Sequence, residues 1–380
     1  MRNLIMLNVF DAFISGAYML IIPLLLIERN ISLSTIGFIF SIFPVVFLIS
    51  RLIFASAADV IGFKKFFNIN GLGNFTSAIF YAISNSPFLY SVAKGLQGLK
   101  ESSLWAVNRN AAYAMANNKN PQMVTSTLLF IRSLSFAIGA LTSGYLLIIA
   151  SFNWVFVFLI GLSILIFIPA NMIDLDSQKR KLTLKILFKN LDLREVNRKV
   201  WKTSLNMSFY MAASTITSSF ILPIYLNSIG FNYWNIGIIL ALYNATGALL
   251  LPVTLYGKPS IKKVIFIQSI LYTPAVISLP FSKKWLVLLI VLIMGLGESL
   301  SYITWESLIA QAVKDQSNIA TTIAFLHAPS NLIMIPSLIF SGLLTEKFGY
   351  IIPFWIASIL FILYSIGSWL ILKYERTTLT

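Results

Sequence analysis

The chain has 380 residues, of which 58% are hydrophobic and only 11% are charged, and its mean hydropathy is +0.84. About a quarter of the residues of an ordinary soluble domain are charged, so the composition excludes that class of protein. The formal net charge is +15, with one His and no Cys. Disulfides are therefore excluded, and a metal site of clustered His and Cys ligands is not expected.

In chain order, polar linkers divide the sequence into twelve apolar segments of about 20 residues, the length that crosses a bilayer as an α-helix. Transmembrane β-strands would be about half as long and would alternate apolar with polar residues. The sequence therefore predicts an all-α integral membrane protein with twelve transmembrane helices. The predicted spans are 3–27, 33–57, 66–84, 87–113, 122–147, 153–173, 203–226, 233–256, 264–281, 285–312, 318–344 and 350–372.

The basic residues gather in the linkers on one side of the predicted membrane. Nineteen Lys and Arg residues lie on the side of the two termini and four on the opposite side. By the positive-inside rule, this distribution predicts that both termini are cytoplasmic. The positive charge is explained by topology and by contact with anionic membrane lipids, and we expect no nucleic-acid partner. A monomer in the cell membrane is the expected form.

Two halves related by an internal repeat are the expected domain organisation. Residues 98–102 and 295–299 share four of five residues at an offset of 197, and Gly37 and Gly237 open two helices at an offset of 200. Such a repeat is typical of membrane transporters whose halves face a shared interior. The predicted units are an N-terminal six-helix bundle at 1–173, a cytoplasmic basic linker at 174–202 and a C-terminal six-helix bundle at 203–380.

Ionisable side chains inside predicted transmembrane helices are costly and mark functional sites. Glu101 and Glu298 lie near the middle of their helices, where we expect a cavity role; a buried contact that only holds helices together is the alternative. Lys100 is expected on a different helix face from Glu101. The candidate substrate- or proton-binding residues are Asp11, Lys94, Gln97, Glu101, Arg132, Glu298, Trp305, Glu306 and His327.

Three of these candidates have an alternative interpretation besides binding of substrate or protons. Lys94 lies toward the outer face and is also able to extend to the interface. Trp305 either stacks on a substrate ring or packs against neighbouring helices. His327, the single His of the chain, is either a proton carrier or a packed neutral ring.

Two short motifs resemble those of the major facilitator superfamily. The segment 55–65, ASAADVIGFKK, is similar to the loop motif G-x-x-x-D-R/K-x-G-R/K-R/K, with Ala55 in place of the first Gly. The segment 94–98, KGLQG, is similar to the pattern R-x-x-Q-G. The resemblance covers essentially the full chain and implies two six-helix bundles that work by alternating access. The antiporter pattern G-x-x-x-G-P is not met, because no Pro follows Gly144.

The resemblance also implies a gate at the cytoplasmic side. Asp59 is expected to accept hydrogen bonds from a neighbouring helix N-terminus, which in this family stabilises the cytoplasm-closed state. Gly62 permits the tight turn that follows, and Lys64 anchors that turn at the membrane face. Arg109 lies near the same face, where pairing with Asp59 or Asp11 is as reasonable as contact with a ligand.

The sequence contains no phosphate-binding glycine loop, no nucleophile–His arrangement and no metal or cofactor motif, so an enzyme is not expected. We predict a secondary active transporter that moves a small polar or anionic organic solute and is coupled to protons through Glu101, Glu298 or Asp11. The alternatives are a proton/drug antiporter for lipophilic compounds and a transporter of amphipathic or lipid-linked substrates. From a different class comes a non-transporting membrane receptor or scaffold.

Overall fold

The structure is a computed structural model that describes residues 1–115, 121–173, 198–257, 260–314 and 319–374. These residues form helices and no strand. The first six helices are α1 (Arg2–Glu28), α2 (Leu33–Ile61), α3 (Phe63–Ile83), α4 (Pro87–Ala114), α5 (Pro121–Ile149) and α6 (Phe152–Met172). The others are α8 (Arg198–Ser218), α9 (Ile221–Ser228), α10 (Tyr233–Gly257), α11 (Ile261–Ser278), α12 (Lys284–Val313), α13 (Ile319–Phe348) and α14 (Ile351–Tyr374).

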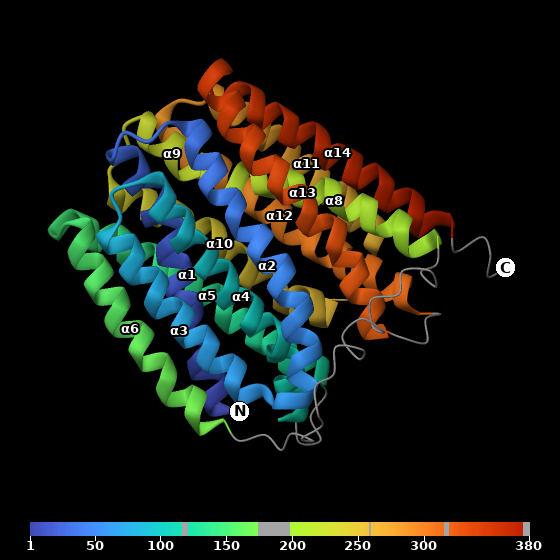
Figure 1. The fold of residues 1–380 in the computed structure, drawn as a ribbon. Helices are drawn as coiled ribbons and strands as arrows, with labels where there is room; N and C mark the ends of the chain where they lie inside the picture. Colours follow the sequence, from blue (N-terminus) through green and yellow to red (C-terminus); the bar gives the residue numbers. More distant parts are fainter. Residues whose placement is uncertain (116–120, 174–197, 258–259, 315–318, 375–380) are drawn as a thin grey trace.

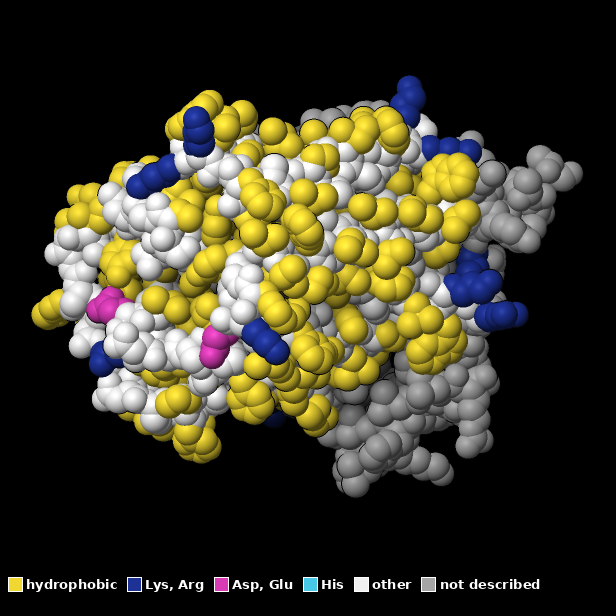
Figure 2. All heavy atoms as spheres, turned by 90° about the horizontal axis from the view of Figure 1, so that it is seen from above, with side chains coloured by type: hydrophobic (Ala, Val, Ile, Leu, Met, Phe, Trp, Pro, Cys, Tyr) yellow, Lys and Arg dark blue, Asp and Glu magenta, His cyan; other side chains and the backbone are white. Residues whose placement is uncertain are grey.

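Helices α8 and α9 are two pieces of one span, so the described residues contain the twelve spans that the sequence predicts. Nine stretches in the described ranges are long and apolar enough to cross a membrane. Helices α3, α4 and α10 are not among them; α3 and α4 carry buried polar side chains such as Asn70, Asn74 and Lys100. Much of the face in Figure 2 is covered by apolar side chains, as expected for a surface in contact with lipid.

Helix packing repeats between the two halves of the chain. In the first half α1 packs on α5 and α6, α3 packs on α4 and α6, and α2 packs on α4. In the second half α8 packs on α13 and α14, α11 packs on α12 and α14, and α10 packs on α12. Figure 1 shows α3 and α6 at one edge of the molecule and α14 at the opposite edge. The internal repeat of the sequence is therefore a repeat of structure.

The turns that follow the first helix of each half are equivalent down to their hydrogen bonds. Asn30 (φ 55°) and Gly230 (φ 84°) both adopt left-handed backbone conformations at an offset of 200. Asn and Gly are the residues that tolerate this conformation best. In each turn the next N–H donates to a carbonyl in the last turn of the preceding helix: Ile31 to Leu26 (3.0 Å) and Phe231 to Leu226 (3.1 Å).

The halves meet through two pairs of glycines, where α2 crosses α13 and α5 crosses α10. A Cβ atom added to Gly144 would lie 2.9 Å from the Cα of Gly237, and one added to Gly37 would lie 3.3 Å from the Cα of Gly342. These pairs let the helix backbones approach closely, as small residues do in membrane proteins.

Polar contacts at the same end of the bundle also join the halves. The Ser34 N–H donates to Glu346 Oε2 (2.8 Å), and the Tyr233 hydroxyl donates to Glu28 Oε2 (3.2 Å). This end carries the α1–α2 and α9–α10 turns, and the N-terminus lies at the other end (Figure 1). The halves are thus in contact at the end of the bundle away from the termini.

The seventh span differs from its expected form as one continuous helix. It breaks at Ser219 and Phe220, between α8 and α9. Pro223 has no N–H to donate to the Ser219 carbonyl, which weakens the helix at this point. Pro23, at the equivalent position, is accommodated within a continuous α1. Helix α8 is described from Arg198, so residues 198–202, expected to belong to the linker, are helical.

Candidate functional site

A cavity of about 990 Å³ lies between the two halves of the helix bundle. Helices α1, α2, α4 and α5 line it from the first half, and α8, α10, α12 and α13 line it from the second. The exposed lining residues include Arg109, Tyr113 and Glu306, toward the ends of α4 and α12 on the side of the termini. The cavity therefore opens on that side and is closed by the glycine pairs at the other.

A cluster of buried charges occupies the first half beside the cavity. The Lys100 ammonium lies 2.9 Å from Asp11 Oδ1 and 2.9 Å from Glu101 Oε1, and it donates to the Ser15 hydroxyl at 2.6 Å. The expectation that Lys100 points away from Glu101 is therefore wrong. Its four-carbon stem lets the ammonium turn back toward a carboxylate on the next residue.

Arg132, on α5, completes this cluster. Its guanidinium lies 3.0 Å from Asp11 Oδ2 and 4.0 Å from Glu101 Oε2, and its Cζ is 5.0 Å from the centre of the Trp105 ring. Two cations thus face two carboxylates. The cluster has no net charge, which is how ionised groups are accommodated at membrane depth.

Amide side chains that are absent from the predicted site surround Asp11. Asn70 and Asn74 donate to Asp11 Oδ1 at 2.9 and 3.0 Å, and the Asn8 carbonyl accepts from Arg132 at 2.9 Å. Asn70 and Asn74 are one helical turn apart on α3, in a segment that is otherwise largely apolar. That spacing is the signal that would have identified them.

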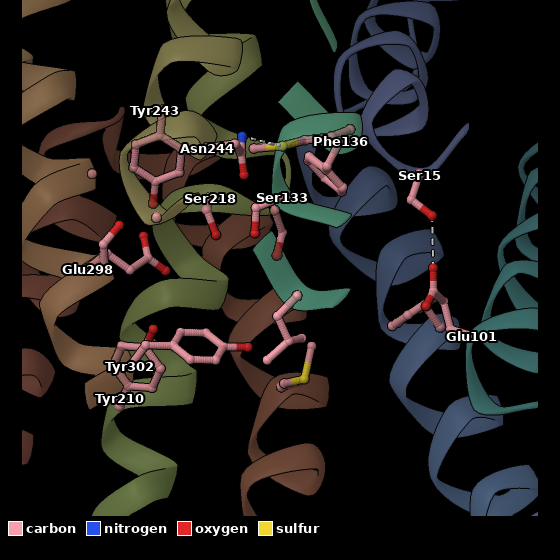
Figure 3. A pocket seen from close by; sticks show the side chains of 18 of the residues that line it. Ser15, Glu101, Ser133, Phe136, Tyr210, Ser218, Tyr243, Asn244, Glu298 and Tyr302 are labelled. Carbon is pink, nitrogen blue, oxygen red and sulfur yellow. Dashed lines mark hydrogen bonds between the residues drawn. The ribbon is translucent and has the colours of Figure 1, made fainter. Parts of the chain in front are cut away.

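The glutamate near the membrane centre of each half accepts a hydrogen bond from a serine at an equivalent position. The Ser15 hydroxyl donates to Glu101 Oε1 (2.9 Å), and the Ser214 hydroxyl donates to Glu298 Oε1. The serines are 199 residues apart and the glutamates 197. Figure 3 shows the two glutamates on opposite sides of the cavity.

The two glutamates differ in what else they contact. Glu101 Oε2 accepts a hydrogen bond from Trp105 Nε1 (3.1 Å), in addition to the contacts of Oε1. Glu298 has no Lys or Arg within 4.0 Å among the residues that the structure describes, and its buried Oε2 has no hydrogen-bond partner there. An unpartnered buried carboxylate oxygen is costly, so Glu298 is the less well satisfied of the two central glutamates.

Aromatic rings replace the ion cluster in the second half. Tyr210 lies 199 residues after Asp11, and its ring centre is 5.5 Å from Trp305 and 5.1 Å from Tyr364. His327 lies 5.4 Å from Trp305. Trp305 and His327 are therefore brought together in a packed aromatic group, and neither is among the residues that line the cavity.

Lys94 and Gln97 line the cavity from α4. The Lys94 side chain is 7% exposed, and its ammonium lies 3.8 Å from the centre of the Phe40 ring. No carboxylate lies within 4.0 Å of it among the described side chains. Gln97 Oε1 accepts a hydrogen bond from the Tyr81 hydroxyl (3.2 Å). Lys94 is thus a buried cation whose contacts in this structure are aromatic rather than anionic.

Arg109 and Glu306 lie at the open end of the cavity. They are 197 residues apart, the same offset that relates the two glutamates near the membrane centre. The repeat therefore places opposite charges at equivalent positions of α4 and α12.

The expected gate is only partly described. Gly62 has φ 84° and joins α2 to α3, which confirms the tight turn, and Lys64 is exposed beside it. Asp59 lies within α2, but its side chain is outside the part of the chain whose side chains are described. Its expected contact with a neighbouring helix stays a prediction.

The family model described as Major Facilitator Superfamily matches residues 4–317. The chain belongs to the major facilitator superfamily. It is a multi-pass membrane protein and a secondary transporter rather than an enzyme, as the sequence predicts. No curated protein matches the chain in sequence.

Solved structures of this superfamily's fold agree with the assignment. A point mutant of the nucleoside transporter NupG is similar with a TM-score of 0.81 at 13% identity, over 97% of this chain and 99% of that one. NupG itself has a TM-score of 0.78 at 12% identity, over 98% and 99% of the chains. The human organic anion transporter MFSD10 (TETRAN) has a TM-score of 0.70 at 14% identity, over 97% and 99%.

Proposed function

We propose that the protein moves a small polar or anionic organic solute by alternating access and couples this movement to protons. The observation that carries the proposal is the cavity between the repeated halves, in which neither Glu298 nor Lys94 has a side chain of opposite charge within 4.0 Å among the described residues. The fold accommodates such solutes, since it is shared by a nucleoside transporter and an organic anion transporter.

Coupling to protons is best assigned to Glu298. A coupling group has to gain and lose a proton as the halves move, and Glu298 Oε2 lacks a fixed partner in the described part of the chain. Glu101 and Asp11 are each within ion-pair distance of Lys100, and Asp11 also of Arg132. We assign them the role of holding α1, α4 and α5 together beside the cavity.

Binding of the solute's anionic group is best assigned to Lys94. Arg132 is engaged by Asp11 and Asn8, which leaves Lys94 as the buried cation that lines the cavity without a carboxylate from the described residues. Residues 1–173 and 203–380 would move as the two units, with the closed end at the glycine pairs opening as the other end closes. Most of the predicted linker at 174–202 lies outside the described residues.

A second candidate is the proton/drug antiporter. The aromatic residues of the cavity lining favour it, among them Phe40, Phe43, Phe136 and Tyr302. Lipophilic cations would then be the ligands, and Lys94 would oppose them. Binding of anionic solutes in preference to lipophilic cations separates the two candidates.

The test is solute accumulation in proteoliposomes under an imposed pH gradient. A thermal-shift screen of polar and anionic solutes at two pH values first selects those that bind, since a ligand of the folded state raises its stability. We expect Glu298→Gln to abolish gradient-driven accumulation while solute exchange without a gradient continues. Lys347→Gln, at an exposed residue at the end of α13 outside the cavity, serves as the comparison and should keep accumulation. Full accumulation by Glu298→Gln would remove this residue from the coupling role.

A further inference from the structure

We propose that the solute is amphoteric: it carries an anionic group, such as a carboxylate or phosphonate, and at some distance from it a basic nitrogen. This inference rests on the proposed transport function and names the class of substrate. It follows from the opposite charges that α4 and α12 present to one cavity.

The α4 side of the cavity is positive. The Asp11, Glu101, Lys100 and Arg132 cluster neutralises itself, so it adds no net charge to this wall. Lys94 remains as an excess cation, 7% exposed and facing the cavity over the Phe40 ring. A buried ammonium has three N–H donors, and a ring face accepts no more than part of that capacity. An anionic group of the solute supplies the missing acceptors.

The α12 side is negative and has polar atoms without partners. Glu298 Oε2 and the Tyr243 hydroxyl are both buried, both belong to cavity-lining residues, and neither has a hydrogen-bond partner among the described residues. Tyr243 packs beside Gly295, one turn before Glu298: a Cβ added to Gly295 would lie 2.9 Å from Tyr243 Cδ2. Figure 3 shows Tyr243 and Glu298 on the same side of the cavity. A protonated nitrogen of the solute satisfies both oxygens.

This opposition of charge is not a by-product of the repeat. The residue 197 positions after Lys94 is Val291, and the residue 197 positions after Arg109 is Glu306. The repeat therefore duplicates the central glutamates but not the cations. One wall is left cationic and the other acidic, from Lys94 and Glu298 deep in the cavity to Arg109 and Glu306 at its opening.

The opposed walls discriminate against solutes of a single charge. A purely anionic solute that reaches Lys94 brings its charge near Glu298, and a purely cationic solute at Glu298 approaches Lys94. Each such solute leaves one buried polar group without a partner, and that loss is a strong source of specificity. A solute with both groups satisfies both walls, and the cavity of about 990 Å³ has room for an apolar or aromatic body between them.

The same arrangement explains competition between solute and proton. An ionised Glu298 attracts the basic nitrogen, and a proton on Glu298 removes that attraction. Protonation at one membrane face would therefore release the solute, which is the coupling that the proposed function needs.

The test measures thermal stability of the purified full-length protein with matched probes. Phenylalanine, the dipeptide Phe-Ala and 3-aminopropylphosphonate supply three amphoteric scaffolds. Each is compared with its N-acetylated form, which lacks the basic nitrogen, and with a form whose acid is amidated or esterified. We expect at least one amphoteric parent to raise the melting temperature, and each blocked form to bind about tenfold or more weakly, as loss of a charged hydrogen bond predicts.

Variants assign each end of the solute to its wall. Lys94→Gln should weaken binding of the parent but leave binding of the amidated form unchanged. Glu298→Gln should weaken binding of the parent but leave binding of the N-acetylated form unchanged. Lys347→Gln, an exposed cation at the end of α13 outside the cavity, is the matched control and should bind as the wild type does.

Two outcomes overturn the inference: blocked forms that bind as tightly as their parents, or no stabilisation by any amphoteric parent. Uptake in proteoliposomes separates this failure from failure of the proposed function. If an N-acetylated probe binds and accumulates under a pH gradient, the transport function stands and the amphoteric class is wrong. If amphoteric probes bind with the expected pattern but none crosses the membrane, the binding site stands and the transport function fails.

Discussion

At the scale of single residues, Asp11 is the member of the ion cluster whose removal should cost most stability. It is fully buried and faces both Lys100 and Arg132. We expect Asp11→Asn to lower the free energy of unfolding by about 3–5 kcal/mol, because it leaves buried positive charge uncompensated. Denaturation of the purified protein in detergent measures this change.

The matched test of charge compensation is the double variant Asp11→Asn with Arg132→Gln. It removes one charge of each sign, so it should recover part of the stability lost by Asp11→Asn. Equal stability of Asp11→Asn and the wild type would mean that the cluster is not ionised in the way the contacts indicate.

The sequence identifies some members of this cluster and misses others for clear reasons. Asp11, Glu101 and Arg132 stand out because each is a charge in an apolar run. The direction of Lys100 is wrong in the sequence-based prediction because helix geometry places the Cβ atom and says little about the end of a long side chain. Asn70 and Asn74 carry no charge, so their importance appears only once Asp11 is seen to lie between them and the cations.

At the scale of helices, the apolar segments locate the twelve spans but not their irregularities. The break between α8 and α9 falls inside one expected span, and the same proline position in α1 leaves that helix continuous. Proline alone does not decide such a break, because neighbouring helices determine whether the freed carbonyl finds another partner. Tertiary packing of this kind is not readable from one segment.

The glycine crossing of α5 and α10 yields a prediction at this scale. A side chain at Gly144 would meet the backbone of α10 at Gly237, so Gly144→Val should separate the helices at the closed end. Overpacking of this kind costs about 1–3 kcal/mol, enough to shift the population several-fold toward states open at that end. The chain has no Cys, so a Cys introduced at position 244 in the cavity is its single thiol. Labelling of this Cys by an impermeant maleimide, applied from the side away from the termini, reports the opening of that end.

Gly161 on α6 provides the matched control, since a Cβ added there has no atom within 4 Å. Gly161→Val should leave labelling of the Cys at position 244 unchanged. If Gly144→Val also leaves it unchanged, the glycine crossing does not hold this end closed.

At the scale of the whole molecule, the repeat is the feature that the sequence predicts best. Gly37 and Gly237 mark the two helix crossings, and residues 98–102 and 295–299 mark the two central glutamates. The sequence does not reveal that Glu101 is neutralised by its neighbours while Glu298 is not, because that difference depends on α1, α4 and α5 meeting in space. Equivalent residues of a repeat therefore take different roles.

The opposite charges at the open end predict how this end closes. In alternating access the ends of α4 and α12 approach one another when the cavity closes on the side of the termini, which brings Arg109 toward Glu306 from repeat-related positions. An exposed ion pair there contributes up to about 1 kcal/mol.

Reversing one charge turns this attraction into repulsion, so Arg109→Glu and Glu306→Arg should each slow transport several-fold by favouring the open form. The double variant that exchanges the two charges should recover most of the transport rate, measured as solute exchange in proteoliposomes. Labelling of a Cys at position 244 from the side of the termini measures how often this end is open. If the exchanged pair transports no better than the single variants, the two residues do not meet during closure, and their charges act only on solute entering the cavity.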